Sequence, residues 1–372
     1  MMSNEKLKIL ISGGGTGGHI FPAIAIANGI KEQYPDAEIL FVGAKGRMEM
    51  EKVPKAGYPI KGLWISGFQR NLSATNLLFP FKVISSLWRA SSIIRQFKPH
   101  IAIGTGGYAS GPLLYQASKK GIPTLILEQN SYPGITNKIL GKKVDTICVA
   151  YQGMEKYFPK EKIVVTGSPI RKEILHITVN KQESLSYFGL KPDLPVLLII
   201  GGSQGARGIN QAVLKNMEKI TATGVQILWQ TGSSSYQEVS EKVQASPMAD
   251  KIIITEFISR MDMAYTASDV IISRAGAIAI AEIVSVGKPA IFIPLPSAAE
   301  DHQTKNAKTL SEQGAALLLP EKEAENRITE TVTNLIHNPK KQERIVKNLQ
   351  AFKTEDATSK IVEQIKKLIK QK

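Results

Sequence analysis

The sequence predicts an α/β protein made of two doubly wound domains, each with a parallel sheet covered by helices. Short apolar segments rich in β-branched residues alternate with helical segments along most of the chain. This alternation starts twice, at residues 7–11 and 196–200, each time with an apolar strand, a glycine turn and a helix. The 372 residues are enough for two hydrophobic cores. We therefore expect two domains facing one another across a cleft.

The first of these starts predicts an anion-binding element. Residues 7–11 form the strand, five glycines follow between positions 13 and 18, and Pro22 falls in the first turn of the helix. Glycine lets the backbone approach a ligand closely, and a helix N-terminus offers free N–H groups with a partial positive charge. His19 lies at that N-terminus, where its imidazole can face the ligand.

Three of these glycines also satisfy the G-x-G-x-x-G pattern of dinucleotide-binding folds. A nicotinamide enzyme needs an acidic residue at the end of the next strand to bind the ribose. The next predicted strand, 39–42, is followed by Gly43, Ala44 and Lys45 instead. The second half of the pattern is therefore missing.

The remaining predicted strands place polar and glycine-rich loops at the carboxyl ends of two sheets. In the first domain we expect strands at 100–103, 125–127, 145–150 and 163–166, and in the second at 226–230, 251–255, 269–273 and 289–293. Glycine or small-residue loops follow at 104–112, 201–210 and 273–282. Ligands of open α/β sheets bind at such ends. We expect domains at 1–169 and 170–349, with a terminal helix at about 350–372 that crosses back to the first domain.

Charge and cysteine content limit the class of protein. The net charge is +15, with 21 basic and 10 acidic residues in 1–170 against 26 and 22 in 171–372. The basic first half predicts an anionic partner: nucleic acid, an acidic membrane or a phosphorylated substrate. No nucleic-acid-binding motif favours the first of these. The single Cys148 predicts a reducing compartment and a buried structural thiol. The charged N-terminal residues predict no signal peptide, and no apolar run reaches the length of a membrane span.

Residues 73–97 contain a dense apolar group, which includes Leu77, Phe79, Phe81 and Trp88 and is flanked by cations. One interpretation is an ordinary core helix after a loop kinked at Pro80. The other is a patch that contacts a membrane surface without crossing it. Both hold if one face of the helix packs inward.

Phosphate-type loops in both domains predict transfer of a group from a nucleotide-activated donor. The leaving diphosphate must be stabilised as its charge grows. The chain has no Asp-x-Asp pair and no Cys/His cluster with metal-ligand spacing. We therefore expect no bound metal, and we assign the charge to helix N-termini and to Arg171.

Seven motifs together resemble the MurG-type glycosyltransferases of family 28: GGGTGGH (13–19), GTGGYASGP (104–112), LEQNSYPGITNK (127–138), GSPIR (167–171), GGSQGAR (201–207), SRAGAIAIAE (273–282) and DHQTKNA (301–307). The resemblance runs in order through nearly the whole chain. It implies the GT-B fold, two Rossmann-like domains, and no cofactor. It implies inverting transfer of N-acetylglucosamine from UDP-N-acetylglucosamine to the 4-hydroxyl of the muramyl-pentapeptide on undecaprenyl diphosphate, which converts lipid I to lipid II in peptidoglycan synthesis. The enzyme would be peripheral, on the cytoplasmic side of an anionic membrane, with other cell-wall synthesis proteins as further partners.

The resemblance also implies roles for individual residues. Donor-binding residues would be Thr16, Gly17, Gly18, Asn130, Arg171, Ser203, Gln204, Ile258, Ala277, Ile278, Ala279, Glu282 and Gln303. Within this group Ile258 would pair with uracil through its backbone, Glu282 would hold the ribose hydroxyls, and Arg171 would lie beside the diphosphate. Acceptor-binding residues would be Gly14, Gly15, His19, Gly106, Gly107 and Tyr108.

Two residues are candidates for the base that takes the proton of the acceptor hydroxyl. His19 is the first, because an imidazole can be neutral at pH 7; its alternative role is structural or acceptor-positioning. Glu128 is the weaker candidate, and its alternative is a hydrogen-bonded carboxylate at a strand end.

Two other classes of function remain open from the residues. A UDP-sugar 2-epimerase, or a transferase with a soluble acceptor, fits the same architecture. A dinucleotide-binding oxidoreductase or a nucleotide sensor fits the first glycine loop alone.

Overall fold

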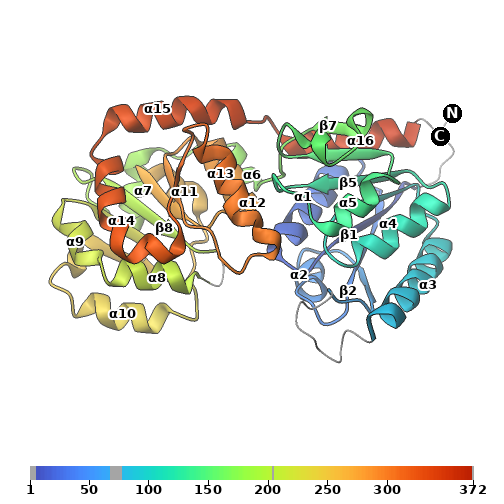
Figure 1. The fold of residues 1–372 in the computed structure, drawn as a ribbon, viewed down its shortest axis with the longest axis horizontal. Coiled ribbons are helices and arrows are strands. Elements are labelled where there is room, and N and C mark those ends of the chain that lie inside the picture. Colours follow the sequence, from blue (N-terminus) through green and yellow to red (C-terminus); the bar gives the residue numbers. More distant parts are fainter. Residues whose placement is uncertain (1–5, 68–77, 203–204, 371–372) are drawn as a thin grey trace. The chain divides into compact units, whose positions relative to one another are not determined.

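The computed structural model describes residues 6–67, 78–202 and 205–370. Its contacts divide the chain into two compact units (Figure 1). Unit 1 is Met1–Ile170 with Thr354–Lys372, and unit 2 is Arg171–Lys353. Each unit is an α/β layer structure around a sheet whose described strand pairs are all parallel. The predicted fold class is therefore confirmed.

Unit 1 is built on a seven-stranded sheet of order β3-β2-β1-β4-β5-β6-β7. Its strands are β1 (Lys8–Gly13), β2 (Glu38–Ala44), β3 (Ile60–Leu63), β4 (Ile101–Gly106), β5 (Thr124–Glu128), β6 (Thr146–Val149) and β7 (Ile163–Val165). Its helices are α1 (Gly17–Gln33), α2 (Glu49–Lys55), α3 (Phe79–Phe97), α4 (Ser110–Lys119), α5 (Ile135–Gly141) and α16 (Ala357–Lys370). Edge strand β3 was not predicted, because IKGL has no continuous apolar run.

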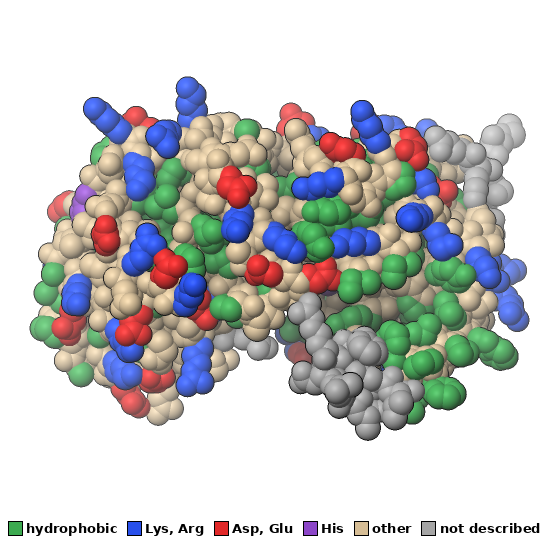
Figure 2. Space-filling model, viewed as in Figure 1, with side chains coloured by type: hydrophobic (Ala, Val, Ile, Leu, Met, Phe, Trp, Pro, Cys, Tyr) green, Lys and Arg blue, Asp and Glu red, His purple; other side chains and the backbone are tan. Residues whose placement is uncertain are grey.

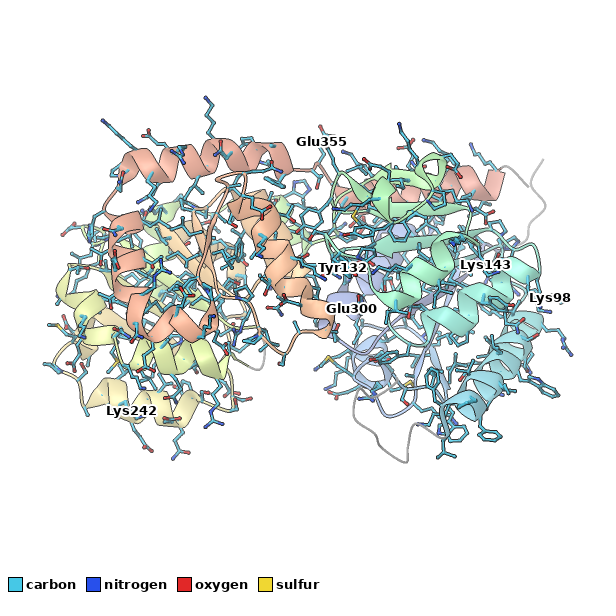
Figure 3. All side chains as sticks on the ribbon, in the orientation of Figure 1. Lys98, Tyr132, Lys143, Lys242, Glu300 and Glu355 are labelled. Carbon is cyan, nitrogen blue, oxygen red and sulfur yellow. The ribbon has the colours of Figure 1, made fainter. Side chains whose placement is uncertain are left out.

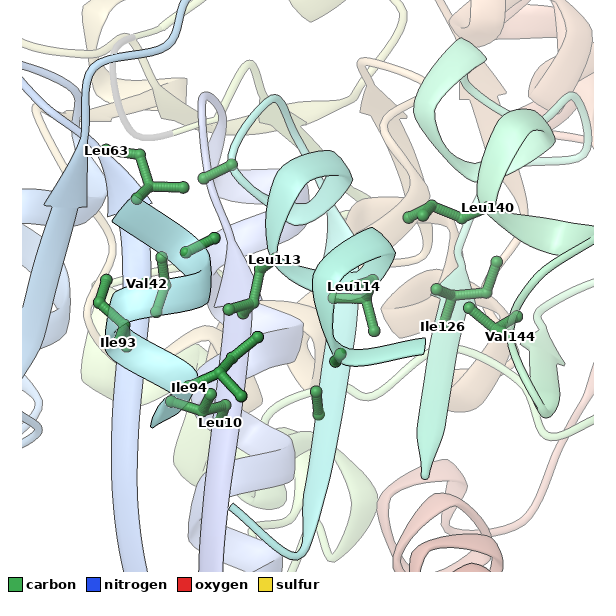
Figure 4. Packing of buried hydrophobic residues seen from close by; sticks show 14 of the residues in the cluster. Leu10, Val42, Leu63, Ile93, Ile94, Leu113, Leu114, Ile126, Leu140 and Val144 are labelled. Carbon is green, nitrogen blue, oxygen red and sulfur yellow. The ribbon is translucent and has the colours of Figure 1, made fainter. Parts of the chain in front are cut away.

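Alternate side chains of the central strands fill two separate cores, as the period of a strand requires. Leu10, Val42 and Ile126 point to the side covered by α3, α4 and α5 (Figure 4). Ile9 and Ile11 point to the other side, which α1, α2 and α16 cover. Continuous apolar runs such as β1 are therefore buried on both faces.

Unit 2 repeats this plan with a six-stranded sheet of order β10-β9-β8-β11-β12-β13. Its strands are β8 (Val196–Ile200), β9 (Gln226–Gln230), β10 (Ile252–Thr255), β11 (Val270–Ser273), β12 (Ala290–Phe292) and β13 (Leu317–Leu318). Its helices are α6 (Lys172–Leu175), α7 (Lys181–Phe188), α8 (Arg207–Leu214), α9 (Met217–Ala222), α10 (Tyr236–Gln244), α11 (Met261–Ala267), α12 (Ala277–Val286), α13 (His302–Ser311), α14 (Glu321–Ile336) and α15 (Pro339–Leu349). The two-residue edge strand β13 was also missed.

The strand orders determine where ligands can bind. In unit 1 the order reverses between β1 and β4, and in unit 2 it reverses between β8 and β11. The loops after the two strands at a reversal lead to helices on opposite faces of the sheet. This opens a crevice outside the carboxyl ends of those two strands. All four of these loops were predicted as glycine or small-residue loops, so the topology brings them together in pairs.

Two local expectations are refined by the structure. Helix α3 begins at Phe79, so Pro80 lies in its first turn, where a proline N–H is not needed, and does not kink a preceding loop. Cys148 is fully buried, and burial raises the pKa of its thiol to about 12. Within the described ranges, no helix is both long and apolar enough to cross a membrane.

The C-terminal helix is held in unit 1 by a close contact with α1. A Cβ added at Gly29 would lie 2.5 Å from Thr358 Cγ2 and 3.4 Å from Val362 Cγ2. Val362 and the neighbouring Ile361 are buried in the same core as the apolar side of α1. Glycine at position 29 therefore sets the distance between the two helices.

We predict that Gly29→Ala destabilises the protein by about 1–3 kcal/mol through overpacking against α16. Without this contact, the same change inside a helix would stabilise it by about 1 kcal/mol. The sign of the shift in the urea midpoint of the full chain therefore tests the packing. Adding Thr358→Ala should restore part of the loss, and a stabilised Gly29→Ala variant would contradict the contact.

Candidate active site

In unit 1 the loops after β1 and β4 touch through their backbones. The Gly14 N–H donates to Gly106 O at 3.2 Å. Gly106 and Gly107 both have positive φ, at 105° and 90°, and a Cβ on Gly107 would lie 2.3 Å from Gly14 O. Only glycine tolerates both the conformation and the approach. The predicted acceptor-binding glycines are thus brought together.

His19 lies in the first turn of α1, beside this contact. Its Nδ1 is 2.9 Å from Thr105 O, a carbonyl that also accepts from Gln129 Nε2 at 2.8 Å. Because a carbonyl only accepts, the Nδ1 of His19 carries the proton, and Nε2 is then the basic nitrogen of the neutral ring. The contact with Thr105 O therefore fixes the tautomer with the proton on Nδ1.

Glu128 has the surroundings of the structural alternative. Its side chain is buried, and its Oε1 accepts from the backbone and side-chain nitrogens of Asn130 at 3.0 and 3.1 Å. Its Oε2 accepts from Gly134 N at 3.1 Å and Asn137 Nδ2 at 2.9 Å. Burial raises the pKa of Glu128, while these hydrogen bonds act against that rise. The carboxylate holds the loop that presents Asn130, and the structure favours this role over that of a base.

Glu49 is a site residue that the sequence analysis missed. It is fully buried at the start of α2, where Oε1 accepts from Ala44 N and Oε2 from Gly15 N, each at 2.9 Å. A Cβ at Gly14 would lie 2.1 Å from Glu49 Oε1. The Gly15 N–H therefore already donates to Glu49, so the expected contact of Gly15 with a pyrophosphate does not have this N–H at its disposal in the present arrangement. Its signal in the sequence is an acidic residue in the first turn of a helix shortly after Gly43.

Glu49 also bears on the dinucleotide interpretation. It is an acidic side chain near the end of β2, but it comes from α2 and its two oxygens bind backbone N–H groups. It is not placed to receive ribose hydroxyls as a strand-end carboxylate would be.

Tyr108, the remaining predicted acceptor residue, is partly exposed, and its ring lies against Gly67.

In unit 2 the loops after β8 and β11 leave neighbouring strand ends, Ile200 and Ser273, at the reversal of strand order. Gly205 has positive φ, and a Cβ there would lie 2.0 Å from Thr231 O. Gly276 is the N-cap of α12, so Ala277, Ile278 and Ala279 form its first turn. Their backbone N–H groups lie at the free end of the helix, which suits a phosphate or a sugar. Ser203 and Gln204 lie outside the described residues.

Arg274 anchors the loop after β11. Its Nη1 donates to Ile293 O at 3.1 Å and Pro294 O at 3.0 Å, and its Nη2 is paired with Glu321. Nearby, the Oε1 of Gln303 accepts from Leu295 N at 3.0 Å. A sugar hydroxyl would therefore meet the Nε2 group of Gln303. Arg274 was not singled out from the sequence, because a lone arginine among small residues has no characteristic spacing.

Ile258, the expected uracil-binding residue, already has a partner for its backbone N–H. That group donates to Gln230 Oε1 at 2.9 Å, and Gln230 Nε2 donates to Gly202 O at 2.9 Å. Gln230 thus links the base segment to the glycine loop after β8. A base that used both backbone groups of Ile258 would have to displace the Gln230 oxygen.

Arg171 and Glu282 form one ion pair, although separate roles were expected for them. Arg171 Nε is 2.7 Å from Glu282 Oε1, and Nη2 is 2.8 Å from Oε2. The Glu282 side chain is 3% exposed and that of Arg171 is 44% exposed. Tyr265, which the sequence analysis did not name, donates its hydroxyl to Glu282 Oε2 at 3.0 Å.

The models of the two domains of one family match the chain in order. The glycosyltransferase family 28 N-terminal domain matches residues 9–149, and the family 28 C-terminal domain matches residues 196–365. A relative from Cytophaga hutchinsonii is 51% identical over 369 residues, and one from Christiangramia forsetii is 50% identical over 368. Each alignment covers 99% of both chains, and both relatives are named UDP-N-acetylglucosamine–N-acetylmuramyl-(pentapeptide) pyrophosphoryl-undecaprenol N-acetylglucosamine transferase.

Solved structures agree on the fold. The crystal structure of Acinetobacter baumannii MurG has a TM-score of 0.80 and 28% identity, and the alignment covers 98% of this chain and 100% of that one. A Neisseria meningitidis UDP-GlcNAc 2-epimerase has a TM-score of 0.66 at 18% identity, with 97% of this chain and 100% of that one covered. The second likeness shows a shared architecture alone. From the family models and the relatives, this chain belongs to glycosyltransferase family 28 and is a glycosyltransferase.

Proposed function

We propose that the protein transfers N-acetylglucosamine from UDP-N-acetylglucosamine to the 4-hydroxyl of an undecaprenyl-diphosphate-linked muramyl-pentapeptide, the step from lipid I to lipid II. The observation that carries this proposal is a glycine loop and a helix N-terminus at the reversal of strand order in each unit. Two such anion sites match two substrates that each contain a diphosphate. The names carried by the relatives support the same reaction.

Unit 2 is proposed to bind the donor. Glu282 receives the ribose hydroxyls, Ile258 meets the uracil, and Arg171 serves the diphosphate together with Ser203 and Gln204. The first turn of α12 and Gln303 meet the sugar. In the complex, unit 1 contributes Thr16, Gly17, Gly18 and Asn130 to the donor sugar, while Gly14, Gly15, Gly106, Gly107 and Tyr108 receive the acceptor.

The proposed step is a displacement at the anomeric carbon of the donor. The acceptor oxygen forms a bond to C1 while the bond from C1 to the β-phosphate oxygen breaks, so the configuration inverts. The hydroxyl proton passes to His19 Nε2, which the Nδ1–H bond to Thr105 O leaves as the basic nitrogen. The electron pair of the broken bond stays on UDP. The N-terminus of α12 and the guanidinium of Arg171 stabilise this growing charge.

We propose that α3 holds the enzyme to the cytoplasmic face of an anionic membrane. Its inward face carries buried Ala90, Ile93 and Ile94. On its outward face, Phe81 is 64% and Trp88 is 80% exposed. Figure 2 shows hydrophobic side chains gathered over α3, with Lys and Arg side chains near them.

The helical periodicity explains this double use of α3. Residues three, four and seven apart share one face, so the outward set can be apolar without disturbing the core. That set is Leu78, Phe81, Ile84 and Trp88. Leu77 lies outside the described residues, and Phe79 is half-buried. Exposed cations on α3 and at its end are Arg89, Arg95 and Lys98, the last of which is labelled in Figure 3. Apolar side chains rimmed by cations suit an anionic bilayer surface.

The first test is thermal stabilisation of the protein by UDP, UDP-N-acetylglucosamine or NADH without added metal. Ligands that bind only the folded state stabilise it, by about 2.7 kcal/mol at 100-fold excess over Kd. We expect both uridine ligands to raise Tm and NADH to leave it unchanged. Transfer to a lipid-linked muramyl-pentapeptide should then release one UDP for each disaccharide formed. A shift with NADH alone would overturn the proposal.

The role of His19 can be tested with His19→Asn, which keeps a donor near Thr105 O but cannot accept a proton. If His19 is the base, kcat should fall by about 10²–10⁴-fold while the donor KM changes little. If His19 only positions the acceptor, the acceptor KM should rise and kcat at saturation should persist. A variant with nearly unchanged kcat would remove His19 from proton transfer.

The membrane proposal predicts that Phe81→Ser/Trp88→Ser weakens binding to phosphatidylglycerol-containing vesicles by about 10-fold or more, because apolar area no longer leaves water. Both side chains are exposed, so the fold and the UDP-induced Tm shift should be unchanged. Tyr187→Ser in unit 2, which removes another exposed aromatic side chain, is the control and should bind vesicles normally. Equal binding by the double variant and the wild type would contradict a docking role for α3.

A further inference from the structure

A buried tyrosine holds the carboxylate that we assign to the donor ribose. Tyr265 lies on α11, is 1% exposed, and donates its hydroxyl to Glu282 Oε2 on α12 at 3.0 Å. We propose that Tyr265 is a positioning residue for nucleotide recognition, which fixes Glu282 so that the carboxylate can receive both ribose hydroxyls. This inference rests on the proposed function, because it gives Tyr265 a role in the same donor site.

The hydrogen bonds to Glu282 show why a second holder is needed. In the described part of the chain, its carboxylate accepts two bonds from Arg171 and one from Tyr265. A carboxylate has about four acceptor positions. Two ribose hydroxyls need two of them, so binding must release at least one bond from Arg171.

The two partners of Glu282 differ in their freedom to move. Arg171 is a long side chain at the N-cap of the four-residue helix α6, and 44% of it is exposed. It can turn from the carboxylate toward the diphosphate, where the proposed reaction needs a cation. Tyr265 reaches Glu282 from the core and has two rotatable side-chain bonds. Its contact can therefore persist when the contact from Arg171 is exchanged for the ribose.

Burial keeps the Tyr265 hydroxyl a donor. Burial, together with the neighbouring Glu282 carboxylate, raises the pKa of Tyr265 well above its usual range. A protonated phenol beside a carboxylate forms a charge-assisted hydrogen bond, which is stronger than a bond between neutral groups. The α11 helix that carries Tyr265 also follows directly after the segment containing Ile258. One side chain thus connects the elements proposed to bind the ribose and the base.

The test compares binding of UDP and 2′-deoxy-UDP to the wild type, Tyr265→Phe, Glu282→Ala and the double variant. Removing the hydroxyl should weaken UDP binding by about 10-fold, the typical effect of a hydrogen bond to a charged group. It should also reduce the preference for UDP over 2′-deoxy-UDP, while kcat at saturating donor stays within about 2-fold. Because Tyr265 acts through Glu282, Tyr265→Phe should have almost no further effect in the Glu282→Ala background.

Thr221→Val is the matched control for loss of a buried hydroxyl. Thr221 is fully buried in unit 2, and its Oγ1 donates to Met217 O at 2.8 Å in α9. This variant should lower Tm without changing the preference between the two nucleotides. The inference is overturned if Tyr265→Phe binds both nucleotides like the wild type, if it weakens both equally, or if its effect adds fully to that of Glu282→Ala. Absence of UDP binding by the wild type would instead overturn the proposed function itself.

Discussion

The contact between the loops after β1 and β4 is the constraint on which the unit 1 site depends. The Gly14 N–H donates to Gly106 O, and a Cβ would lie 2.3 Å from Gly14 O at position 107 and 2.5 Å from His19 Nδ1 at position 106. This approach brings Thr105 O to His19, which determines the tautomer of the ring. The same crowded region leaves space for the Glu49 carboxylate only because position 14 has no side chain. Steric freedom at three glycines thus determines which polar atoms meet.

Unit 2 reaches a similar result by different means. Its loops lie at the equivalent reversal of strand order, but here polar side chains hold the site. Gln230 binds the loop after β8, Arg274 binds the segment after β12, and Tyr265 binds the Glu282 carboxylate of α12. Each side chain is buried and bound to a backbone carbonyl or a carboxylate. Losing that hydrogen bond would cost free energy, so each side chain stays ordered. Such supporting groups make the exposed Arg171 the movable member of its pair.

Much of this architecture could be predicted from the sequence because its signals are local. Apolar runs of strand length, glycine turns and helix starts revealed the strands of both sheets except β3 and β13. Those two are short edge strands whose pairing is decided by the neighbouring strand and not by their own pattern. The predicted loops leave neighbouring strand ends in both units, as parallel topology requires, and in unit 1 they are joined by a backbone hydrogen bond. The pairing of Arg171 with Glu282, 111 residues apart, has no local signal.

The sequence by itself therefore determined the class of fold, the positions of the phosphate-type loops and, through its motifs, the family. Periodicity and turn chemistry act over a few residues, and the information they carry can be read along the chain. Only the tertiary structure decided which hydrogen bonds the site residues make: Glu128 with its loop, Glu49 with Gly15, and Tyr265 with Glu282. The reason is physical, because a buried polar group bonds whichever partner the packing of distant elements brings within about 3 Å.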